Sequence, residues 1–149
     1  MLRNAVGPGK KQMLEYLRKL KPDVVHAHDT YGLMVKGLDL PRVFTIHGFI
    51  YTNTLFSGTR FSWLRSKIWK YIEVSGWADQ PHIISISPVV REHLTGIAAG
   101  VVYDIDNPVN ERCFEIKRCE RKGRIFSSAK IYPLKNTLGL IKSFGKLIE

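Results

Sequence analysis

Short apolar runs that each break into polar or turn residues constrain the fold of this chain more than any other feature. In order, they are PDVVHAH at 22–28, VFTIHG at 43–48, IISIS at 83–87, DIDNPV at 104–109 and SSAKIYPLKN at 127–136. Stretches with helical spacing of apolar residues lie between them. This alternation predicts an α/β fold with a Rossmann-like parallel sheet flanked by helices.

In a parallel sheet of this kind, the loops at the carboxyl ends of the strands carry the chemistry. The polar residues at the ends of the first four runs are His28, His47, Ser87 and Asn107. His26 and His28 alternate with Ala27, so both rings point to one side of their strand. A His-x-His pair can bind zinc, but no third ligand is evident, and we expect His26 to be a packed histidine.

The segments between the expected strands carry further signals. We expect helices over 9–20 and 62–77, and a long aromatic loop over 49–61. One stripe of the second helix should face the core, namely Leu64, Ile68, Tyr71 and Ile72. A different stripe carries Trp63, Lys67, Lys70, Val74 and Trp77. That second stripe is either a membrane-contacting face or a set of tryptophans at the rim of the core beside solvated lysines.

The formal net charge of +10 comes from 23 Lys and Arg against 13 Asp and Glu. Such a surplus indicates an anionic partner, and nucleic acid, anionic lipid and a phosphorylated substrate are the candidates. The basic residues are scattered and no nucleic-acid motif occurs, so we expect no nucleic acid among the partners. A plain solvated basic surface is the remaining alternative.

The cysteines and the hydropathy pattern bear on the compartment. Cys113 and Cys119 are the two cysteines, and their spacing fits no zinc pattern and no disulfide framework. No apolar run reaches the roughly 18 residues that a membrane-spanning helix needs. We therefore expect a cytoplasmic protein that is at most peripheral to a membrane.

Taken together, the ordered segments resemble family-4 (group 1) glycosyltransferases, which are retaining, nucleotide-sugar-dependent enzymes with the two-domain GT-B fold. The resemblance rests on PDVVHAH, TIHG, the Ser after the next strand, NPV followed by Phe114, and SSAKIYPLKN, and it extends from about Lys10 to Leu147. Each motif alone is weak, whereas five in order make a specific pattern.

The resemblance implies a partial GT-B architecture. Residues 1–116 would form part of the N-terminal, acceptor-side domain, 117–123 a linker, and 124–149 the start of the C-terminal, donor-binding domain. That start should contain a strand over 124–129 and a helix over 136–147. The first strand of the family's sheet is missing, so the strand at 23–27 would lie at an edge, and we expect self-association or a partner chain that supplies the missing strands.

The resemblance also assigns roles to single residues. His47 matches the histidine that lines the sugar site in the cleft between the domains. Lys130 and Lys135 match the Arg and Lys that grip the donor diphosphate, as two cations at a strand–helix junction would. Lys130 stands where Arg is usual. Lysine keeps the positive charge but cannot bind a phosphate through two parallel N–H groups, as the guanidinium of Arg does. Ala129 stands where Gly is usual.

By this resemblance, the partners are a nucleotide-sugar donor and a glycan or lipid-linked acceptor. No metal ion and no other cofactor is expected. The segments that would complete the donor site are not in the chain, so we expect the isolated chain to lack activity. Two other functions stay open: a non-catalytic remnant that binds a phosphorylated ligand or a partner protein, and a basic nucleic-acid-binding module.

Overall fold

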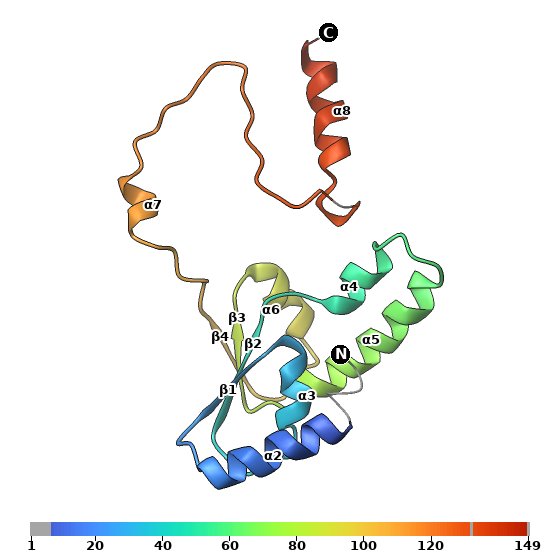
Figure 1. Ribbon diagram of the computed structural model, residues 1–149, viewed down its shortest axis with the longest axis vertical. Coiled ribbons are helices and arrows are strands. Elements are labelled where there is room, and N and C mark those ends of the chain that lie inside the picture. The colour runs from blue at the N-terminus through green and yellow to red at the C-terminus, as the bar shows by residue number, and fades with distance from the viewer. Residues whose placement is uncertain (1–6, 132, 149) are drawn as a thin grey trace.

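The computed structural model describes residues 7–131 and 133–148. Its centre is a four-stranded sheet with the strand order β1-β2-β3-β4, and every neighbouring pair is parallel. The strands are β1 (Val25–His28), β2 (Arg42–Ile46), β3 (His82–Ser85) and β4 (Val101–Asp104). The fold is therefore α/β with a Rossmann-like parallel sheet, as the order of apolar runs predicts (Figure 1).

Helices connect the strands and flank the sheet. They are α2 (Pro8–Leu20), η1 (Asp29–Tyr31), α3 (Gly32–Val35), α4 (Ile50–Leu55), α5 (Ser62–Trp77), α6 (Pro88–Leu94), α7 (Arg112–Glu115), η2 (Pro133–Lys135) and α8 (Thr137–Ile148). Several boundaries have clear local causes. Lys21 adopts a left-handed conformation before Pro22 and ends α2, while Ser87 accepts a hydrogen bond from the Val90 N–H and precedes Pro88 at the start of α6.

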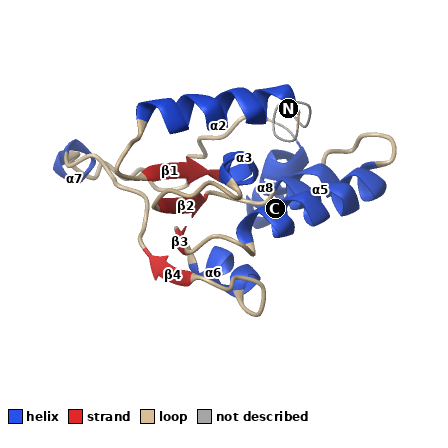
Figure 2. Ribbon diagram, turned by 90° about the horizontal axis from the view of Figure 1, so that it is seen from below, coloured by secondary structure: helices blue, strands red, loops and turns tan. Residues whose placement is uncertain are grey.

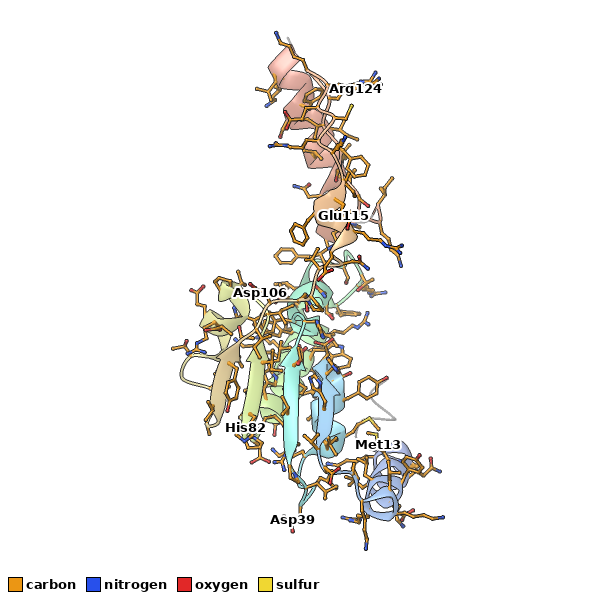
Figure 3. The ribbon with its side chains drawn as sticks, turned by 90° about the vertical axis from the view of Figure 1, so that its left-hand side faces the viewer. Met13, Asp39, His82, Asp106, Glu115 and Arg124 are labelled. Atoms are coloured by element: carbon orange, nitrogen blue, oxygen red, sulfur yellow. The ribbon has the colours of Figure 1, made fainter. Side chains whose placement is uncertain are left out.

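The hydrophobic core lies on one face of the sheet. Ala27, Phe44 and Ile83 point to this face from three adjacent strands, and α3, α5 and α6 cover it (Figure 2). Among the described residues, no helix covers the opposite face, onto which Figure 3 looks. The Tyr103 side chain on that face is 42% exposed. The sheet is thus packed from one side.

Gly100 marks a close approach of two backbone segments just before β4. A Cβ atom at this position would lie 2.1 Å from the Gln80 carbonyl oxygen and 2.5 Å from that of Pro81. Both atoms belong to the backbone that leads into β3, so neither can swing aside. The pairing of β3 with β4 therefore requires glycine here.

Three expectations about local structure are wrong. Residues 50–55 of the supposed loop form α4, which packs along α5. Residues 124–129 form no strand, because no neighbouring strand is there to pair with them among the described residues. The stripe of α5 that was expected to face the hydrophobic core lies mainly toward solvent. Leu64 is 45% exposed and Tyr71 is 77% exposed. The helix instead buries Ser66, Glu73, Gly76 and Trp77.

Beyond β4 the chain leaves the sheet domain. Side chains from 105 to 131 are exposed, including both cysteines, which are free thiols. The helix expected over 136–147 is present as α8, and it stands apart from the sheet (Figure 1). No described helix is both long enough and apolar enough to span a membrane.

The first strand lies at an edge of the sheet, as expected. Among the described residues, β1 pairs with β2 alone, so its other side offers free backbone groups. Self-association through this edge stays a prediction.

Because Gly100 contacts rigid backbone, Gly100→Ala should lower the free energy of unfolding by about 1–3 kcal/mol. Thermal or urea unfolding, followed by circular dichroism, measures the change. Gly145→Ala in α8 is the matched control, because nothing lies within 4 Å of a Cβ at that position. Equal stability of the two variants would contradict the requirement for glycine at residue 100.

Candidate functional site

The candidate site lies where the four parallel strands end. In Figure 3 the strands run from the level of His82 toward that of Asp106, so all four carboxyl ends meet at one edge. His28 is the last residue of β1, and His47 directly follows β2. The register pairs His28 with Thr45, two residues before His47. Parallel pairing therefore brings the two histidines together although 19 positions separate them in the sequence.

The two imidazoles form a direct hydrogen bond, with 2.9 Å between His28 Nδ1 and His47 Nε2. Their rings are stacked with centroids 5.2 Å apart, and both side chains are exposed. In such a pair one ring donates its N–H and the other accepts, so at least one of the two rings is neutral. The pair can therefore bind a hydroxyl group or accept a single proton.

His26 extends the cluster along β1. Its ring centroid lies 4.3 Å from that of His28, which confirms that both rings point to the same side of the strand. His26 Nε2 and the Thr45 hydroxyl oxygen are 2.7 Å apart. The expectation of a packed histidine is wrong, because His26 is exposed on the face of the sheet that no described helix covers.

The pKa of His28 is lowered from its usual value. Partial desolvation of this otherwise exposed ring is the largest cause, followed by the positive charges that His26 and His47 acquire on protonation. The Asp29 carboxylate acts in the opposite direction. The ring of His28 is therefore neutral over a wider pH range than that of an isolated histidine.

Asp29 fixes the relative positions of the two strand ends. Its carboxylate oxygen Oδ1 accepts a hydrogen bond of 2.8 Å from the backbone N–H of His47. Its backbone is left-handed, with φ of 46°, which Asp tolerates better than most residues. Asp29 was not among the residues predicted for the site, although its place directly after His28 was a usable signal.

Glu73 is a second acidic residue that was not predicted from the sequence. This side chain on α5 is buried, and its two oxygens accept hydrogen bonds of 2.9 and 2.8 Å from the N–H groups of Ile50 and Tyr51. It thereby satisfies backbone donors at the N-terminus of α4. Burial raises the pKa of Glu73, the two backbone hydrogen bonds lower it, and the charge of Asp29 raises it further. The available signal was that Glu73 is the one acidic residue between Asp39 and Asp79.

A hollow lies at the carboxyl ends of β3 and β4. Its volume is about 330 Å³, and it is lined by Ser85, Ser87, Pro88, Arg91, Asp104 and Asp106. Arg91 forms an ion pair of 3.4 Å with Asp104 and donates to the Val102 carbonyl oxygen. Ser87, which the sequence analysis placed at this edge, is thus a wall of the hollow as well as a helix cap.

His93 packs against the same region from α6. Its ring stacks on that of Phe49, with centroids 4.4 Å apart, and Phe49 in turn stacks on Trp77. His93 is half-buried. The ring of Phe49, which follows β2, covers part of His93 on α6.

Lys130 and Lys135 lie on the segment beyond the sheet domain, and both are exposed. Across residues 7–131 and 133–148, no hydrogen bond or ion pair joins either lysine to His47. In the same residues, no cluster of three or more His, Cys, Asp or Glu is arranged to hold a metal ion. The assignment of a diphosphate site to these lysines stays a prediction, as does the independence from metal.

The parallel sheet and the polar groups at its carboxyl edge define a Rossmann-like α/β domain. A family model described as Glycosyltransferase Family 4 matches residues 3–112. The chain belongs to Glycosyltransferase Family 4. No curated protein matches the chain.

The raised pKa of Glu73 predicts a pH dependence of stability. The folded state holds this proton more tightly than the unfolded state, so the free energy of unfolding should fall as the pH rises from about 4.5 through the raised pKa. Urea titrations at a series of pH values measure the slope. Glu73→Gln should remove this contribution, whereas Glu92→Gln, at an exposed position on α6, should keep it. An unchanged slope in Glu73→Gln would contradict the assignment.

The lowered pKa of His28 predicts its titration directly. In a proton–carbon NMR titration, the His28 ring should have a midpoint below 6.5. His47→Ala should move this midpoint upward, because the charge of His47 is one cause of the shift. His82→Ala, at the opposite ends of the strands, is the control and should leave the midpoint in place.

Proposed function

We propose that this chain is part of a glycosyltransferase that transfers a sugar from a nucleotide-sugar donor to an acceptor glycan or lipid. The observation that carries the proposal is the hydrogen-bonded pair His28–His47 at the carboxyl edge of the sheet, in a chain that belongs to Glycosyltransferase Family 4. In open parallel sheets, ligands bind at this edge.

In this proposal, the His47 ring contacts the transferred sugar. It is exposed, while its backbone is held by Asp29 and its ring by His28, so it meets a ligand in a fixed position. Because the ring is already held in place, it loses little conformational entropy when it binds the sugar. His28, neutral over a wide pH range, maintains the hydrogen bond that orients His47.

Lys130 and Lys135 take the departing nucleoside diphosphate. Negative charge grows on the diphosphate as its bond to the sugar breaks, and two ammonium groups stabilise that charge. These cations do the work that a metal ion does in other glycosyl transfers, so the reaction we propose is metal-independent. The transfer proceeds with retention of configuration.

The proposed roles of the parts follow their order in the chain. Residues 1–116 supply the acceptor side, 117–123 link the two parts, and 124–149 begin the donor-binding part. The exposed course of the chain after β4 supports a division there, since its side chains take no part in the core of the sheet domain.

The test is calorimetry of the 149-residue chain with a panel of nucleoside diphosphates. We expect Kd values on the order of millimolar, since this proposal assigns two lysines to the diphosphate and no residue to the nucleobase. The double variant Lys130→Ala, Lys135→Ala should abolish this binding, and the control Lys142→Ala, Lys146→Ala on α8 should preserve it. His47→Ala should leave the affinity for the diphosphate unchanged. Binding that survives the loss of Lys130 and Lys135 would refute the donor-side assignment.

A further inference from the structure

The hairpin of α4 and α5 (residues 50–77, the α4–α5 hairpin) projects from the sheet domain, with its connecting loop at the far end (Figure 1). It carries a group of large exposed apolar side chains: Leu55, Phe56, Phe61, Trp63, Leu64, Ile68 and Tyr71. Each of these is between 45% and 77% exposed. Soluble proteins rarely gather so many on one element unless the surface binds a partner.

The charge of the same hairpin is of one sign. Its basic residues are Arg60, Arg65, Lys67 and Lys70, and all are exposed. No Asp or Glu occurs from Leu40 to Ile72. Glu73, the first acidic residue after that stretch, is buried and turned toward the N-terminus of α4. The outer surface of the hairpin is therefore cationic without any acidic side chain to offset it.

Cations and aromatic rings are interleaved on this surface. The Arg60 guanidinium lies 4.9 Å from the centroid of the Phe61 ring, and the Lys67 ammonium lies 5.4 Å from that of Trp63. Aromatic rings next to Lys and Arg are typical of surfaces at the boundary of a lipid bilayer, where the rings enter the headgroup region and the cations meet lipid phosphates.

The hairpin is held in shape before any partner arrives. The Ser66 hydroxyl donates to the Tyr51 carbonyl oxygen at 2.7 Å and joins α5 to α4. At the tip, the Ser57 hydroxyl donates to the Thr54 carbonyl oxygen, and Arg65 donates to the Thr59 hydroxyl. The apolar and basic side chains are thus presented by a fixed frame, which lowers the cost of ordering on binding.

From these observations we infer that the α4–α5 hairpin docks on an anionic lipid bilayer. The face involved is the outward side of α5 with the loop at residues 56–61. Aromatic and aliphatic side chains enter the interface, and the four cations pair with lipid phosphates. The contact is peripheral, and it does not depend on the proposed glycosyl transfer.

The first test is co-sedimentation of the 149-residue chain with vesicles. Vesicles of phosphatidylcholine mixed with phosphatidylglycerol should bind the chain, and vesicles of phosphatidylcholine alone should bind it at least about tenfold more weakly. Lys67→Glu, Lys70→Glu should lower binding to the anionic vesicles by about tenfold or more. The control Lys117→Glu, Lys122→Glu changes the net charge equally on the linker and should retain most of the binding. An equal loss in both double variants would show that net charge alone acts, and would overturn the inference.

The second test removes apolar contact without changing charge. Ile68→Ser, Tyr71→Ser should weaken binding severalfold, whereas Ile125→Ser, Phe126→Ser, at exposed positions after the linker, should not. Circular dichroism melting checks that each variant is folded. Binding that is unaffected by the hairpin variant would overturn the inference.

A third measurement uses the folded wild-type surface and so does not depend on a disruptive variant. Brominated phosphatidylcholine in the anionic vesicles should quench tryptophan emission of the chain, and Trp63→Phe should remove most of the quenching. Quenching that persists would place another surface at the bilayer. Two other results would also refute the lipid assignment: a duplex DNA of matched charge that competes equally through Lys67 and Lys70, or hairpin-dependent dimers in place of vesicle binding.

Discussion

The in-register parallel pairing of β1 through β4 is the constraint on which the site depends. Because the strands run in one direction, each places its last residue at the same edge of the sheet. His28 and His47 meet there at 2.9 Å although they belong to different strands. Gly100 permits the pairing of β3 with β4, since the side chain of any larger residue would meet the backbone that leads into β3. The histidine pair is in this sense a consequence of backbone geometry.

Two acidic side chains hold the backbone that follows β2 at the carboxyl edge of the sheet by hydrogen bonds. Asp29 accepts a hydrogen bond from the backbone N–H of His47, and Glu73 accepts hydrogen bonds from the first two residues of α4, which follow His47 closely in the chain. Both carboxylates accept hydrogen bonds from backbone N–H groups, so they order the chain without depending on a flexible side-chain partner. The same loop that presents His47 to the edge also leads into the α4–α5 hairpin. Glu73 therefore holds the start of the hairpin, while Asp29 holds the residue that precedes this loop.

The sequence predicted the sheet well because each strand carries its own apolar run between turn residues. The exposed face of α5 could not be predicted in the same way. Helical spacing of Leu64, Ile68 and Tyr71 shows that they share a face, but spacing is identical for a face that meets the core and one that meets an interface. What decides the matter is that Ser66 and Gly76, small residues, allow α5 to approach its neighbours on the other side.

The contacts of Asp29 and Glu73 were beyond sequence patterns for a different reason. Their partners are backbone groups 18 and more positions away, and backbone groups carry no sequence signature.

A strand over 124–129 was predicted from a run of residues alone. A strand exists only where a neighbour accepts its hydrogen bonds, and the described residues offer none to this segment. The two lysines assigned to the diphosphate, Lys130 and Lys135, follow that segment, and their assignment stays a prediction.

The one-sided packing of the sheet has a thermodynamic consequence. The heat capacity change of unfolding and the denaturant m-value both grow with the surface that unfolding newly exposes. In this chain one face of the sheet, the segment after β4 and most of α8 are already in contact with solvent in the folded state. Both quantities should therefore be small for a chain of 149 residues. The curve of stability against temperature is correspondingly shallow, so that moderate cooling or warming changes the folded fraction only gradually.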